Sequence, residues 1–320
     1  MATAGFTNGG IWWPSHVYPK IEAMGFDTIW TSEHVMLWRP IFDGIPLMAG
    51  IAACTETIEV GSSVLLFPLR HPLMLAKELT TIDRMSGGRL VVGAGGGGDY
   101  RPELENTGPA KNYGRRFNEM IDVMRQFWTE TWVTHSGEFF EFEEAGLMEP
   151  KPVRDGHIPL LIGGRSDAAI DRAILRGNGY QPYMYHARRV GEAYQQVRNR
   201  AEELNVELAD DYRWSCFVYL SVDEDEQRAW DSAHHDLSWR YNQDASMIVD
   251  KYVLKGSPEQ VREGIQGYLD AGVQDFCFGL THPHSLVENA IADETQTKAA
   301  LDHFAMISEE ILPLVHGHTK

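Results

Sequence analysis

The sequence IEVGSSVLLFPLRHPLMLAKELTTIDRMSGGRLVVGAGGG, residues 58–97, contains one complete strand–helix–strand unit. Its β-rich run Val60–Leu66 is followed by Pro72–Ser86, where leucine and isoleucine recur at helical spacing. Gly87-Gly88 is a typical signal for the end of a helix, and a second β-rich run, Arg89–Gly93, begins directly after it. Two strands joined by a helix predict a βαβ unit with parallel strands.

The same alternation extends in both directions over the rest of the chain. A Rossmann fold would place GxGxxG directly after the first strand, and that pattern is absent there. Eight strands alternating with helices instead predict an α/β fold, a (β/α)8 TIM barrel formed as one domain by residues 1–320. The predicted strands are Ala4–Asn8, Thr28–Ser32, Val60–Leu66, Arg89–Gly93, Pro159–Gly163, Gly179–Tyr183, Trp214–Val222 and Gln274–Gly279.

Between the strands, apolar stripes and capping signals predict helices. Three connections exceed the roughly 2–6 residues usual between strands and helices, which predicts insertions after strands 4 and 7. They are Gly98–Asn112, Asp223–Lys255 and Thr131–His157, the last with a small hairpin at Trp132–Phe142. The predicted helices are Pro72–Ser86, Tyr113–Glu130, Asp167–Arg176, Ala187–Leu204, Pro258–Ala271 with Ser257 as its cap, and about Thr295–Ile311.

The charge balance argues against nucleic acids and membranes as partners. Lys and Arg number 28 and Asp and Glu number 46, so the net charge is 28 − 46 = −18. Such a surface repels phosphate backbones and anionic lipids. Three cysteines without CxxC spacing indicate a reducing compartment, and neither a signal peptide nor a bilayer-spanning apolar run is recognisable. We therefore expect a cytoplasmic location.

Function in such barrels collects at the carboxyl ends of the strands. Glu33 and His34 directly follow the second predicted strand, where an imidazole can act as general acid or base. The alternative is a structural histidine paired with a nearby carboxylate such as Glu33. Gly61–Val64, within the third strand, contains small residues that would allow either a flat ligand or tight barrel packing.

Two glycine-rich turns are further candidates. Five of the six residues in Gly93–Gly98 are glycine, which indicates backbone lying against a ligand or a flexible loop. Gly163-Gly164-Arg165-Ser166 precedes a predicted helix, so its amides, its hydroxyl and Arg165 could bind a phosphate. An ordinary turn with Ser166 as helix cap explains the glycines and the serine, but it does not explain Arg165.

A metal-dependent hydrolase is an alternative function. His282 and His284 follow the last predicted strand, and an HxH pair at a barrel rim can bind a metal ion. No partner ligands on other strands are recognisable, so we expect no metal site.

The chain resembles the bacterial-luciferase-like superfamily of flavin- and deazaflavin-dependent oxidoreductases. The resemblance is carried by EAMGFDTIWTSEH (22–34), the 58–97 block quoted above, GRRFNEMIDVMRQFWTE (114–130), PKPV with IPLLIGGRS (150–166) and RGNGYQP (176–182). It implies a barrel with a flavin or deazaflavin ring in its mouth and a phosphate near strand five.

The resemblance also implies roles for individual residues. His34, with Glu33 beside it, corresponds to the rim histidine near the reactive ring, and Ser63-Val64 to a non-prolyl cis peptide behind the ring. Trp38 matches an aromatic residue of the F420-using sugar-phosphate dehydrogenase branch. Many relatives have an aromatic or acidic residue after the glycine run. This position reads Gly98-Asp99 here, a departure in which Asp99 could supply the carboxylate. The remaining expected cofactor contacts are Ser62, Gly95, Gly96, Gly97, Gly163, Gly164, Arg165, Ser166, Gly179 and Tyr180.

Two chemistries follow from the resemblance. With coenzyme F420 the enzyme would transfer a hydride to or from a small organic substrate, and with reduced FMN it would act as a monooxygenase. The second requires a separate reductase to supply reduced flavin. Relatives often form homodimers through helices such as Pro72–Ser86, so we expect one here. A non-catalytic flavin-binding relative is the remaining alternative.

Overall fold

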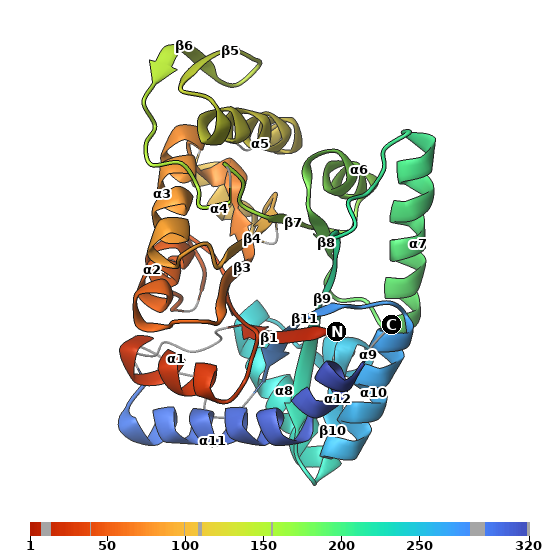
Figure 1. The fold of residues 1–320 in the computed structure, drawn as a ribbon. Coiled ribbons are helices and arrows are strands. Elements are labelled where there is room, and N and C mark those ends of the chain that lie inside the picture. The colour runs from red at the N-terminus through yellow and green to blue at the C-terminus, as the bar shows by residue number, and fades with distance from the viewer. Residues whose placement is uncertain are drawn as a thin grey trace.

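The computed structural model describes residues 1–7, 14–38, 40–98, 100–107, 111–154, 156–281 and 292–318, and they form a closed parallel barrel (Figure 1). Each barrel strand pairs in parallel with its neighbours, and β8 closes the ring on β9. The predicted (β/α)8 fold is therefore confirmed. Its strands are β1 (Thr3–Thr7), β2 (Thr28–Thr31), β3 (Glu59–Leu66), β4 (Leu90–Gly95), β7 (Leu160–Gly163), β8 (Gly179–Gln181), β9 (Arg213–Val222) and β11 (Asp275–Leu280).

The six predicted helices are all present, each within one residue of its expected bounds. They are α3 (Pro72–Met85), α5 (Tyr113–Thr129), α6 (Asp167–Arg176), α7 (Ala187–Glu203), α10 (Pro258–Asp270) and α11 (Glu294–Glu310). As predicted, the hydroxyl of Ser257 accepts a hydrogen bond from the amide of Gln260 at the start of α10. No helix in the described part of the chain is both long and apolar enough to cross a membrane.

Sequence reasoning missed several helices. Among them, α1 (Pro14–Ala23) contains Pro19, and α2 (Gly44–Cys54) is apolar on nearly every face, so neither shows a clear polar–apolar stripe. The others are α4 (Arg101–Thr107), α8 (Glu226–Tyr241), α9 (Ser246–Tyr252), α12 (Leu312–Gly317) and the 3-10 turn η1 (Phe67–Leu69).

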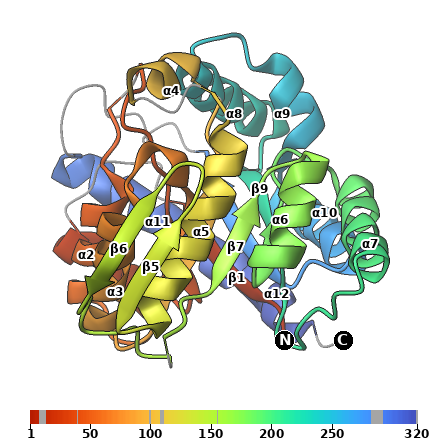
Figure 2. The same cartoon turned by 90° about the horizontal axis from the view of Figure 1, so that it is seen from above.

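Both predicted insertions contain ordered structure. After β4, the strands β5 (Trp132–Ser136) and β6 (Glu141–Gly146) form the expected hairpin, which Figure 2 shows outside the barrel beside α5. Glu119 of α5 anchors it, because its carboxylate accepts hydrogen bonds from the amides of Phe139 and Phe140. After β9, the insertion consists of α8, α9 and the short strand β10 (Val253–Gly256), which extends the sheet alongside β9.

The interior of the barrel is filled by side chains. Trp30, Val91, Leu161 and Cys277 form a buried cluster inside the ring of strands. Trp30 fits only because Gly61 faces its ring: a Cβ at Gly61 would lie 2.4 Å from a Trp30 ring atom. The space for a ligand is therefore at the carboxyl ends of the strands, above this cluster.

Candidate active site

A cavity of about 290 Å³ opens at the carboxyl end of the barrel. Residues from six strand ends and from α8 line it, which follows from the parallel order because all these ends meet at one rim. Figure 2 shows α4 and α8 at the same end of the barrel. The lining residues are Ser32, Glu33, His34, Leu37, Trp38, Ile41, Ser63, Val64, Leu66, Gly95, Gly96, Gly97, Tyr100, Gly163, Gly164, Arg165, Gln181, Tyr183, Phe217, Tyr219, Arg240 and Tyr241.

His34 is paired with a carboxylate that sequence reasoning did not identify. Its Nδ1 lies 3.1 Å from Oε2 of Glu103, a buried residue of α4. The other oxygen of Glu103 accepts hydrogen bonds from the amides of Val35 and Met36. Although burial opposes ionisation, these bonds and His34 hold the pKa of Glu103 below its usual value. An ionised Glu103 can only accept, so Nδ1–H of His34 donates the hydrogen bond to it and Nε2 is the nitrogen that can exchange a proton with a ligand.

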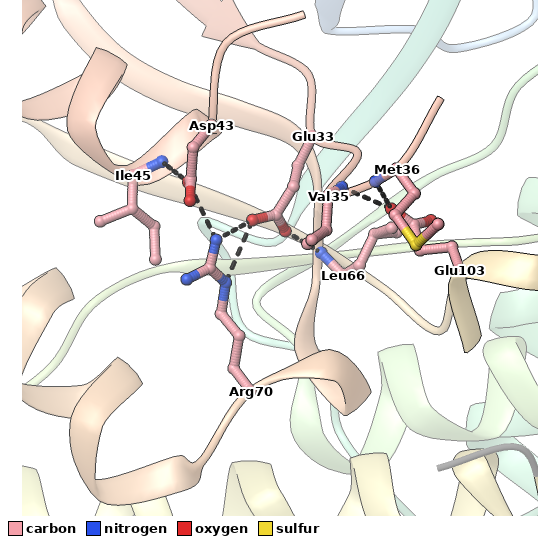
Figure 3. Close-up of polar contacts among 8 residues, drawn as sticks. All are labelled: Glu33, Val35, Met36, Asp43, Ile45, Leu66, Arg70 and Glu103. Atoms are coloured by element: carbon pink, nitrogen blue, oxygen red, sulfur yellow. Dashed lines mark hydrogen bonds and ion pairs between the residues drawn. The ribbon is translucent and has the colours of Figure 1, made fainter. Parts of the chain in front are cut away.

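Glu33 has a different partner (Figure 3). Its carboxylate accepts hydrogen bonds from the amide of Leu66, at 2.6 Å, and from the guanidinium of Arg70. Arg70 also binds Asp43, whose carboxylate caps α2 by accepting from the amide of Ile45. Burial raises the pKa of Glu33, while Arg70 opposes that effect. Glu33 thus joins β2 to the end of β3, and the partner of His34 is Glu103 rather than Glu33.

The third strand bulges into the cavity at Ser63-Val64. This peptide bond is cis, as the resemblance implied, and the β3–β4 register shifts between Ser62 and Leu65. Val64 packs against two glycines on neighbouring strands: a Cβ would lie 2.4 Å from it at Gly95 and 2.9 Å at Gly163. The glycines of both predicted turns therefore leave room for the Val64 side chain, which packs between them. We call this side chain the Val64 ridge.

The predicted phosphate turn lies between β7 and α6. Ser166 caps α6, because its side chain accepts from the amide of Ala169 at 3.2 Å. Gly164 has a φ of 129°, a region that disfavours side chains, and Tyr180 donates a hydrogen bond to its carbonyl at 2.9 Å. Arg165 lies in the cavity wall, with its guanidinium 4.9 Å from the ring centre of Tyr183. The amides at the start of α6 and Arg165 can bind an anion here.

Aromatic residues form another part of the cavity wall. The indole nitrogen of Trp38 donates to the carbonyl of Arg240 at 2.9 Å, which ties the loop after β2 to α8. The Trp38 ring also packs edge-on against Tyr100 at 4.8 Å. From β9 and α8, Tyr219 and Tyr241 add hydroxyl groups that lie 2.7 Å apart.

The structure separates the predicted site residues into three groups. Eleven line the cavity: Glu33, His34, Trp38, Ser63, Val64, Gly95, Gly96, Gly97, Gly163, Gly164 and Arg165. Four do not line it: Ser62, Ser166 and Tyr180 form hydrogen bonds with Gly93, Ala169 and Gly164, and Gly179 begins β8, away from the rim. Asp99, His282 and His284 lie outside the described residues.

The cavity lining fits a flavin or deazaflavin. Five glycines leave one wall without side chains, and the Val64 ridge between them offers a flat apolar support. The turn at Gly164 and Arg165 adds an anion-binding end on the same side. Among the described residues, no cluster of His, Cys, Asp or Glu is suited to hold a metal ion.

Residues 18–275 match the protein family described as luciferase-like monooxygenase. An F420-dependent glucose-6-phosphate dehydrogenase from Amycolatopsis mediterranei is 23% identical over 292 residues, which cover 81% of this chain and 85% of that relative. The oxygenase component of a flavin-dependent trigonelline monooxygenase from Acinetobacter baylyi is 30% identical over 166 residues, covering 51% and 45%. A solved F420-dependent secondary alcohol dehydrogenase, in complex with an F420–acetone adduct, shares the fold with a TM-score of 0.80 at 18% identity, covering 98% and 99%.

Proposed function

The chain belongs to the luciferase-like monooxygenase family and is a flavin- or F420-dependent oxidoreductase, and we propose that it uses F420 to interconvert an alcohol and a carbonyl compound. The observation that carries this proposal is the His34–Glu103 pair at the cavity. The F420-dependent relative, which matches over most of both chains, supports the choice of cofactor.

Alcohol oxidation removes a hydride from carbon and a proton from oxygen, and the protein must handle the proton. When bound, F420 supplies the hydride acceptor at its ring. His34 takes the hydroxyl proton at Nε2, because Nδ1 is held by Glu103. The Glu103 carboxylate stabilises the imidazolium that results, as in other His–carboxylate pairs. In the reverse direction His34 returns this proton to the carbonyl oxygen.

The remaining predicted residues bind and position. Gly164, Arg165 and the amides at the start of α6 would hold the cofactor phosphate. The Val64 side chain would support one face of the ring. Glu33 acts as a positioning residue, because it fixes the chain next to His34 through Leu66 and Arg70.

The test is a fluorescence titration of the protein with F420 and, separately, with FMN. We expect F420 to bind, and His34→Ala to retain that binding while losing alcohol-dependent F420 reduction. His16→Ala, on the exposed face of α1, is the matched control and should leave both unchanged. Normal turnover by His34→Ala would refute the proton-transfer role. A wild type that binds a cofactor without any turnover would favour the non-catalytic alternative, and its metal content would test the metal-hydrolase alternative.

Monooxygenation with reduced FMN is the second candidate. The 30% identity to the oxygenase component of a flavin-dependent monooxygenase favours it. This function would need a separate reductase to supply reduced flavin. FMN binding without F420 binding, together with substrate-dependent oxygen consumption, would select it over the first proposal.

The proposed assembly is a homodimer formed through α3. Met74 and Met85 expose apolar side chains on this helix, which favours a contact there. Size-exclusion chromatography with light scattering measures the mass of the assembly in solution. Met74→Lys should shift a dimer toward monomer.

A further inference from the structure

The wall of the cavity formed by β9 and α8 contains a charged side chain that the proposed chemistry does not use. Arg240 is almost fully buried, and its guanidinium donates to Asp236 at 2.8 Å, one turn earlier on α8. Its Nε has no hydrogen-bond partner among the described residues. The guanidinium carbon lies 5.9 Å from the ring centre of Tyr219.

Asp236 removes the net charge of this group. Burial acts to lower the pKa of Arg240, but the Asp236 carboxylate raises it, so the two side chains form an ion pair with no net charge. An anionic ligand beside Arg240 would have to be desolvated, and the nearby Asp236 carboxylate would offset the attraction of Arg240 for it. The other Lys or Arg among the lining residues is Arg165, at the turn assigned to the cofactor phosphate.

The rest of this wall suits a neutral oxygen function. The Tyr219 and Tyr241 hydroxyls lie 2.7 Å apart, and phenol hydroxyls both donate and accept hydrogen bonds. Such groups can bind an alcohol, which both donates and accepts hydrogen bonds. They can equally bind its carbonyl product, which only accepts them. Arg240 lies beside these hydroxyls, and its charge is compensated by Asp236.

The mouth of the cavity is apolar. Val35, Met36 and Trp38 on the loop after β2 are 55%, 40% and 39% exposed, and Leu37 and Ile41 continue this surface inward. Exposed apolar side chains beside a ligand cavity indicate contact with an apolar ligand. The net charge of −18 further disfavours anions.

We propose that the substrate is an uncharged, largely apolar alcohol or carbonyl compound, and that Asp236 excludes phosphorylated and carboxylated molecules by neutralising Arg240. This assignment rests on the proposed function, because it names the substrate of the same site. Asp236 is thus a specificity-determining residue that works through Arg240.

The test compares two probes of similar shape and different charge, acetophenone and benzoate, by calorimetric titration of the cofactor-saturated protein. The wild type should bind acetophenone at least about tenfold more tightly than benzoate. Asp236→Asn leaves Arg240 uncompensated and should raise benzoate affinity about tenfold or more, with little change for acetophenone. Asp231→Asn, an exposed position of α8, makes the same charge change away from the cavity and should alter neither affinity.

Two results would overturn the assignment. One is that benzoate binds the wild type as tightly as acetophenone does. This measurement needs no variant. The other is unchanged benzoate affinity in a folded Asp236→Asn protein. If that variant unfolds, the uncharged double variant Asp236→Asn/Arg240→Gln replaces it. The double variant should keep the preference for acetophenone. A gain in benzoate affinity in it would contradict the assignment. If the protein binds neither F420 nor FMN, the proposed function is refuted, and a gain of benzoate affinity in Asp236→Asn, measured without cofactor, would still support the role of Asp236.

Discussion

Nδ1 of His34 lies 3.1 Å from Oε2 of Glu103, although 69 positions separate the two residues in the chain. The same carboxylate holds the amides of Val35 and Met36, so it orients both the histidine ring and the backbone that follows it. Catalysis by His34 should therefore depend on a residue that is itself absent from the cavity lining.

Glu103→Gln should lower turnover by about 10²- to 10⁴-fold while leaving cofactor affinity within a few-fold of the wild type. The amide keeps much of the shape but cannot stabilise a positively charged imidazolium. Steady-state rates and fluorescence titrations measure the two effects. Glu105→Gln, an exposed neighbour on α4 that pairs with Arg101, is the control. Equal losses of rate in both variants would show that helix stability, and not Glu103, is responsible.

Arg70→Met should destabilise the protein by about 2–4 kcal/mol, because it leaves the buried Glu33 carboxylate without its cation. Its effect should diminish at acidic pH, where Glu33, whose pKa is already raised, takes up a proton more readily. Urea unfolding at several pH values tests both statements. Arg101→Met removes an exposed ion pair on α4 and should cost less than about 1 kcal/mol. If both variants lose a similar free energy of unfolding, the buried Glu33–Arg70 pair stabilises the protein no more than an exposed ion pair does.

Gly95→Ala should weaken cofactor binding, because the new Cβ would lie 2.4 Å from Val64 and force the ridge to move. Overpacking of this kind costs about 1–3 kcal/mol of stability. Gly191→Ala, within α7, is the matched change, because its Cβ would make ordinary contacts at 3.5 Å and should stabilise the helix by about 0.5–1 kcal/mol. Unaltered cofactor affinity in folded Gly95→Ala would exclude the ridge as a ring support.

The strands of the barrel could be predicted because each is a short apolar run bounded by turn signals. Residues adjoining strand ends, such as His34 and Arg165, could be placed at the rim for the same reason. Glu103 and Arg240 could not, because they lie on the helices α4 and α8, and nothing local marks a helical carboxylate or guanidinium as buried. Nor could adjacency in sequence show that Glu33 binds Arg70 while His34 binds Glu103.

The lower end of the barrel contains a carboxylate whose ionisation should oppose folding. Asp275 of β11 is buried and accepts a hydrogen bond from the hydroxyl of Thr3 at 2.9 Å. Burial raises its pKa to about 6, although Arg213 acts in the opposite direction and Glu59 adds to the rise. Because the folded pKa exceeds the unfolded value, the protonated group favours the folded state. This contribution is complete below about pH 4 and is lost as the pH rises through about 6.

Asp275→Asn should therefore be more stable than the wild type by about 1–3 kcal/mol at neutral pH, and the difference should vanish near pH 4. The amide retains an acceptor for Thr3 and carries no charge to desolvate. Urea unfolding of both proteins between about pH 4 and pH 8 gives the difference directly. Asp270→Asn, at the exposed end of α10 where it binds Gln266, should show no such pH dependence. If Asp275→Asn is instead less stable at neutral pH than at acidic pH relative to the wild type, the Asp275 carboxylate stabilises the fold, and Arg213 outweighs the cost of its burial.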